Sequence, residues 1–256
     1  MNKLEINNKK GDISINILVL MTLAVVCLAL FYFSQDRIIE NKISNAGLLD
    51  SVYGDETNLL FLLDKSLESS LLSSYNTLAS GCDLSREFCG FDANNVDNGL
   101  KESVIKKFKE SANKYPDSVS SQDKVNYYKE IKENVNDNKY DIQLNGKEAI
   151  LVVPGFLFSK AINKSKIDIF VVEYRTDLVV NLTYVDLGII GFKEIYERSK
   201  SCLSVNTENC LKEKLNLFNV EVSKSDKGYI IFLESRKLLL IDGESKKIKF
   251  NFFLGQ

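Results

Sequence analysis

The stretch that decides the architecture of this chain lies near its N-terminus, where residues 13–35 read ISINILVLMTLAVVCLALFYFSQ. None of these 23 side chains is charged. A helix rises about 1.5 Å per residue, so the segment reaches roughly 34 Å and can cross a hydrocarbon core of about 30 Å. We therefore predict a transmembrane helix over residues 12–35, with the lipid bilayer as a partner.

The C-terminal end of this run indicates that the helix stays in the mature protein. An ordinary secretory peptidase needs a shorter apolar core followed by small residues. Here the segment Leu30-Phe31-Tyr32-Phe33 is bulky throughout. Aromatic residues of this kind are typical of a membrane–water interface.

Four cysteines outside the apolar run indicate on which side of the membrane the chain folds. They form two close pairs, Cys82 with Cys89 and Cys202 with Cys210. Disulfides persist outside the cytoplasm, so we predict two local bridges in a single-pass protein of the cell membrane whose C-terminal domain lies outside the cytoplasm. A four-thiolate zinc site and a redox-active pair stay open as alternatives, although both motifs prefer shorter cysteine spacings.

The N-terminal flank of the apolar run carries a family resemblance that covers about the first 50 residues. A short leader ending in Lys9-Lys10-Gly11, then Asp12 and the hydrophobic helix, resembles the class III signal of archaeal type IV pilin-like proteins. The resemblance implies cleavage between Gly11 and Asp12 on the cytoplasmic side. It also implies that the helix anchors the protein and that its partners are copies of itself or other pilin-like subunits. The best-known pilin pattern has glutamate where this chain has Asn16, and an uncleaved anchor is the alternative interpretation.

The remaining sequence predicts an α+β fold with helices first and a mainly antiparallel β-sheet in the C-terminal half. We divide the chain into a basic leader (1–11), the transmembrane helix (12–35), a helical stem and helical region (36–135), and an α+β extracytoplasmic domain (136–256). Both charge signs are interspersed along the chain, which carries 33 basic and 35 acidic residues. That pattern is typical of a solvated surface, and we expect no nucleic-acid partner.

Apolar residues at helical spacing predict the helices. The stem is expected to run from Ser34 to about Leu49 and to bend or stop at Gly47 and Gly54. A second helix, ending at Gly81, is predicted from one apolar stripe: Leu60, Leu63, Leu67, Leu71, Tyr75 and Leu78. Shorter helices are expected over residues 101–112, 123–135, 192–200 and 208–216, and Asn- and Asp-rich loops over 94–99 and 134–138.

Runs rich in Val, Ile, Phe and Tyr predict the strands. They cover residues 149–158, 167–174, 178–185, 218–222, 229–234, 237–241 and 247–253. Between the second and third strands, Arg175-Thr176-Asp177 is expected to form a turn. Between the last two, Asp242-Gly243 is expected to form the loop of a hairpin.

The chain lacks residues on which most hydrolase mechanisms depend. The chain has no histidine, which removes Ser-His-Asp and Cys-His nucleophile arrangements and the commonest transition-metal ligand. No glycine-rich phosphate loop occurs either. We expect no enzymatic activity, no metal and no cofactor. Catalysis by a pair of carboxylates is the enzyme hypothesis that the sequence leaves open.

Two N-glycosylation sequons occur, at Asn163-Lys164-Ser165 and Asn181-Leu182-Thr183. Asn163 lies in a loop-like stretch, whereas Asn181 lies in a predicted strand and would have to face outward. Together these features favour a membrane-anchored structural protein of the cell surface, pilin-like or minor-pilin-like, in adhesion or filament assembly. The second hypothesis is an uncleaved, membrane-anchored sensor or ligand-binding ectodomain, which requires a concave pocket.

Overall fold

The computed structural model describes residues 19–26, 28, 37–82, 84–90, 96–115, 127–163, 169–203 and 206–255. Within them the chain is α+β, with helices first and antiparallel sheets in the C-terminal half, which confirms the predicted fold class. Of the expected membrane span, residues 19–26 and 28 are described and are helical, and the rest lies outside the described residues. None of the helices in the described ranges is both long and apolar enough to cross a membrane.

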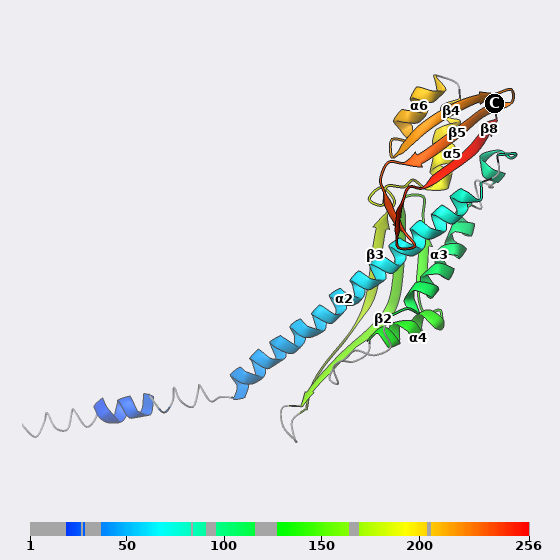
Figure 1. The fold of residues 1–256 in the computed structure, drawn as a ribbon. Coiled ribbons are helices and arrows are strands. Elements are labelled where there is room, and N and C mark those ends of the chain that lie inside the picture. The colour runs from blue at the N-terminus through cyan, green and yellow to red at the C-terminus, as the bar shows by residue number, and fades with distance from the viewer. Residues whose placement is uncertain are drawn as a thin grey trace, which may run out of the picture.

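Two larger sheets and six helical segments make up the folded body. The helical segments are α2 (Arg37–Ser80), the 3-10 turn η1 (Phe88–Gly90), α3 (Val96–Ala112), α4 (Tyr127–Asn136), α5 (Phe192–Lys200) and α6 (Thr207–Lys214). The strands are β1 (Asp141–Leu144), β2 (Glu148–Asn163), β3 (Ile169–Thr183), β4 (Phe218–Ser225), β5 (Gly228–Ser235), β6 (Leu239–Ile241), β7 (Glu244–Lys246) and β8 (Lys249–Gly255). They pair as antiparallel sheets in the orders β1-β2-β3 and β4-β5-β8, with β6-β7 as a separate hairpin. Figure 1 shows α2 running diagonally past the first sheet toward the second.

Helix α2 is one uninterrupted helix of 44 residues, so the predicted bend or stop at Gly47 and Gly54 is wrong. A glycine inside a helix costs only about 1 kcal/mol relative to alanine, which tertiary packing offsets. That packing is the predicted apolar stripe: Leu63, Leu67 and Tyr75 are among its fully buried members. Its two ends, Leu60 and Leu78, are half-buried.

The first sheet is dominated by the long β2–β3 hairpin, and the turn predicted at residues 175–177 does not exist. Those residues lie inside β3, opposite a bulge at Pro154-Gly155 of β2. Gly155 has φ +61° there, and its backbone N–H donates a 2.8 Å hydrogen bond to the carboxylate of Asp177. The polar residues that suggested a turn therefore lie opposite a bulge, where Asp177 accepts the backbone hydrogen bond of Gly155.

Helix α4 covers the edge of β2 where β1 ends. The hydroxyl of Tyr127 donates a 2.8 Å hydrogen bond to the carbonyl of Ser159 in β2. Strand β3 forms the opposite edge of the sheet, and the order β1-β2-β3 places no further strand beside it in the described residues.

The second sheet packs one face on α5 and on the C-terminal part of α2. The ring of Tyr75 in α2 stacks on Phe192 in α5 at 4.2 Å, and Phe192 meets Phe250 of β8 edge-on at 5.7 Å. The hydroxyl of Tyr75 also donates a 2.8 Å hydrogen bond to the carbonyl of Ile190. Helix α2 therefore belongs to the cores of both sheets.

Other corrections concern the ends of elements. The hairpin at Asp242-Gly243 is confirmed, with positive φ at both residues, but it joins β6 to the short β7, and the later strand, β8, pairs with β5. Helix α3 already begins at Val96, inside the predicted loop 94–99, and α4 continues through Asn136. Strand β1 was not predicted. Asn163 was expected in a loop and is instead the last residue of β2.

Candidate functional site

Both predicted disulfides are present, and each fixes the position of a helix end. Cys82 at the end of α2 bonds to Cys89 in η1, with their Cα atoms 4.4 Å apart. The sulfur of Cys89 also lies 3.5 Å from the carbonyl oxygen of Asn251 in β8, and Glu87 forms a bridge with Phe253 of the same strand. The first disulfide therefore holds the C-terminal end of α2 against the edge of β8.

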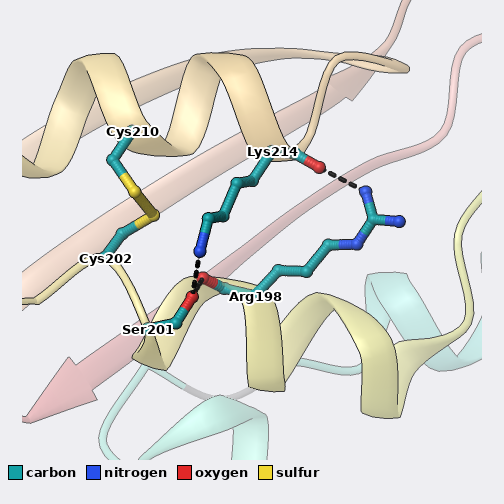
Figure 2. Close-up of a disulfide and its surroundings, with 5 residues drawn as sticks. All are labelled: Arg198, Ser201, Cys202, Cys210 and Lys214. Atoms are coloured by element: carbon teal, nitrogen blue, oxygen red, sulfur yellow. Dashed lines mark hydrogen bonds between the residues drawn. A yellow bond between two sulfur atoms is a disulfide. The ribbon is translucent and has the colours of Figure 1, made fainter.

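The second disulfide joins α5 to α6, as Figure 2 shows for Cys202 and Cys210. Around it, the guanidinium of Arg198 donates a hydrogen bond to the carbonyl of Lys214. The ammonium of Lys214 donates a 2.7 Å hydrogen bond back to the hydroxyl of Ser201. The two short helices are thus connected by one covalent and two polar links. All four cysteines are consumed in disulfides, which excludes them as zinc ligands in this state.

The other predicted site residues lie apart from the disulfides. Gly11 and Asp12 lie outside the described residues. Asn181 is exposed on β3, and its side-chain amide donates a 3.1 Å hydrogen bond to Glu148. Asn163 ends β2, and the rest of its sequon lies outside the described residues. Glycosylation at either asparagine stays a prediction.

A cleft lies where the two sheets meet, and we call it the junction cleft. It consists of two adjoining hollows of about 600 and 580 Å³ that share Gly146, Lys147, Glu148 and Glu194. Its walls come from the β1–β2 turn, the end of β3, the start of α5 and the segment before β4. The further lining residues that matter for its chemistry are Asp97, Asn145, Tyr184, Ile189, Lys193 and Arg198.

Two glycines set the floor of the junction cleft. A Cβ atom added to Gly191 would lie 2.7 Å from the carbonyl oxygen of Gly146. The β1–β2 turn and the start of α5 therefore touch through their backbones. The Asn145-Gly146 pair is a strong hairpin signal, and with it the sequence could have revealed this turn.

Some charges in the junction cleft are already paired, while others are free to meet a ligand. Arg198 forms a 2.6 Å ion pair with Glu194. Hydrogen bonds donated by the amides of Asn145 and Asn181 lower the pKa of Glu148. Lys147 forms no ion pair with any residue in the described ranges.

A half-buried carboxylate, that of Asp97, and a buried phenol, that of Tyr184, complete the junction cleft. Burial raises the pKa of Asp97, although the charge of Lys193 opposes the shift. Tyr184 is only 2% exposed, and burial, followed by the charge of Asp97, raises its pKa above the ordinary value. Its hydroxyl has no hydrogen-bond partner among the described residues. The cleft offers charged, amide and apolar groups, and this mixture suits the binding of a small molecule.

The chain matches no family model, no curated protein and no solved structure. Any functional conclusion therefore depends on the residues of the chain themselves.

Proposed function

We propose that this protein is a single-pass, membrane-anchored structural protein of the cell surface, a pilin-like or minor-pilin-like subunit that acts in adhesion or filament assembly. The uncharged run at residues 13–35 supports the anchor, and its basic leader supports the resemblance to archaeal pilin-like proteins. The two disulfides support a domain outside the cytoplasm, where such bonds persist.

The observation that carries this proposal is the shape of α2. The helix begins at Arg37, just after the apolar run, and Figure 1 shows its N-terminal part projecting away from the folded body. Leu49 and Asp50 are exposed, whereas Val52 is fully buried. The backbone of α2 therefore extends about 15 residues, or roughly 22 Å, on the N-terminal side of Val52. A projecting helix that follows an apolar segment is the form expected of a stem that holds a domain above a membrane.

The mature N-terminus tests the proposal. Mass spectrometry of the protein from its native membranes is expected to find a chain that begins at Asp12. A Gly11→Val variant should keep the leader, since a small residue is what the implied peptidase requires at the cut, whereas a Gly54→Ala variant should be processed normally. A wild-type protein that still begins at Met1 would overturn the pilin-like proposal.

The second candidate, an uncleaved ligand-binding ectodomain, is favoured by the junction cleft. The volume of each of its two hollows lies within the roughly 300–1,000 Å³ typical of small-molecule sites. A small-molecule screen on the full chain should then find a compound that raises the unfolding midpoint. The shift should disappear in Lys147→Glu and persist in Lys224→Glu, which changes an exposed lysine on β4. Equal shifts in both variants would contradict binding in the cleft.

A further inference from the structure

The outer face of the β4-β5-β8 sheet carries side chains that the core does not use. Alternation along the strands turns Val220, Leu233 and Phe252 inward, where they are buried against the helices. Their neighbours point to the other face. Helices α5 and α6 pack on the inner side, so the outer side is open.

Strand register arranges the outer side chains in two rows across the sheet. One row is Glu221, Phe232 and Asn251, and the next is Asn219, Glu234 and Lys249. Together with Leu233, these six residues line a hollow of about 260 Å³, which we call the Phe232 hollow.

The second row is fixed by hydrogen bonds that all converge on Glu234. Its carboxylate accepts from Lys249 at 2.8 Å, from Lys247 at 3.0 Å and from the amide of Asn219 at 3.4 Å. These bonds, led by that from Lys249, lower the pKa of Glu234 to about 2. One wall of the hollow is therefore preorganised, and the charge of its carboxylate is neutralised by two lysines.

The first row is free. The Phe232 ring is half-buried and contacts no other aromatic ring in the described part of the chain. Within the same part, the side chains of Glu221 and Asn251 make no hydrogen bond. An aromatic ring thus lies between an unpaired carboxylate and an unpaired amide, on a backbone that the first disulfide supports through Asn251.

We propose that the Phe232 hollow binds a single pyranose ring of a glycan. The face of an aromatic ring is electronegative and packs well against the C–H face of a sugar. The hydroxyl groups around that sugar can donate to Glu221 and both donate to and accept from the amides of Asn219 and Asn251. The hollow lies just below the size of sites for drug-sized ligands, which suits one ring.

This inference goes beyond the proposed function and gives a surface protein a ligand class for adhesion. The two can fail separately. A chain that begins at Met1 but binds sugar would overturn the pilin-like proposal alone, and a chain that begins at Asp12 without binding sugar would overturn the present one alone.

Saturation-transfer NMR on the full chain, held in micelles of an amine-oxide detergent that contains no sugar, tests the proposal. The probes are glucose, galactose, mannose and N-acetylglucosamine. At least one is expected to receive saturation, mainly at the protons on one face of its ring. Phe232→Ala should weaken that binding at least about tenfold, and Asn251→Ala should weaken it less.

Phe61→Ala is the matched control, because it removes an exposed aromatic ring of α2 that does not line the Phe232 hollow. It should leave sugar binding unchanged. Glu221→Gln keeps the test valid should Phe232→Ala fail to fold, since it changes one exposed acceptor and should still weaken binding. The proposal is overturned by the absence of binding to all four sugars, by binding that survives both Phe232→Ala and Glu221→Gln, or by binding of tetramethylammonium alone, which would indicate a cation site.

Discussion

At the scale of single residues, Gly191 is a position where a side chain would clash with the backbone of another element. Its missing Cβ leaves room for the carbonyl of Gly146, which would otherwise lie 2.7 Å away. Gly191→Ala must therefore push the β1–β2 turn away from α5, and we expect it to lower the free energy of unfolding by about 1–3 kcal/mol. Urea denaturation measured by circular dichroism gives this quantity.

A second glycine provides the control for Gly191. Gly54 is exposed on α2, and nothing lies within 4 Å of an added Cβ. Gly54→Ala should raise stability by about 0.5–1 kcal/mol, because alanine is the better helix former. If both alanine variants shifted stability in the same direction, the close approach of Gly191 to Gly146 would not be the cause.

The half-buried ion pair between Lys160 of β2 and Asp55 of α2 makes a second residue-scale prediction. Its nitrogen and oxygen lie 3.4 Å apart, and the side chains are 13% and 21% exposed. A partly buried ion pair contributes more to stability than a surface pair does. Lys160→Ala should therefore lower the free energy of unfolding by about 1–2 kcal/mol. The exposed pair of Lys212 with Glu208 is the matched comparison, and Lys212→Ala should cost at most about 0.5 kcal/mol. Equal losses in the two denaturation curves would contradict this ranking.

At the scale of elements, α6 depends on the second disulfide. It has only 8 residues, and isolated helices shorter than about 12 are marginal in water. Replacing Cys202 and Cys210 together by alanine should cost about 2.5 kcal/mol on the chain-entropy model, and the amides of α6 should lose hydrogen-exchange protection before those of α5. The same double replacement at Cys82 and Cys89 is the control, since it should leave the protection of α6 unchanged. Protected α6 amides without the second disulfide would show that its packing alone is sufficient.

The elements also show what the sequence could predict. Helix α5 was predicted with its observed bounds, because its apolar and charged residues alternate at helical spacing between turn signals. Strand β3 was divided wrongly, because Asp177 serves a bulge on the neighbouring strand and no local pattern reveals that partner. The junction cleft could not be predicted at all. It assembles residues from separate segments, such as Asp97, Glu148 and Lys193, which only the packed fold brings together.

At the scale of the whole molecule, α2 joins the two sheets, because its buried residues contribute to both cores. Leu67 is fully buried near the middle of the packed part of the helix. Leu67→Ala leaves a cavity there and should cost about 2–5 kcal/mol. If the packing of α2 makes the two sheets one cooperative unit, the loss of stability should appear in both sheets. We therefore expect equal decreases in hydrogen-exchange protection for the slowest amides of β2 and β5.

The control lies on the same helix. Phe61 is 60% exposed, and Phe61→Ala should change stability by less than about 0.5 kcal/mol and leave both sheets protected. If Leu67→Ala weakened β2 while β5 kept its full protection, the two sheets would be independent units that merely share a helix. Loss of protection in both sheets would instead mean that the stem helix and both sheets unfold together. A force or a cleavage acting on α2 would then also destabilise the Phe232 hollow on the second sheet.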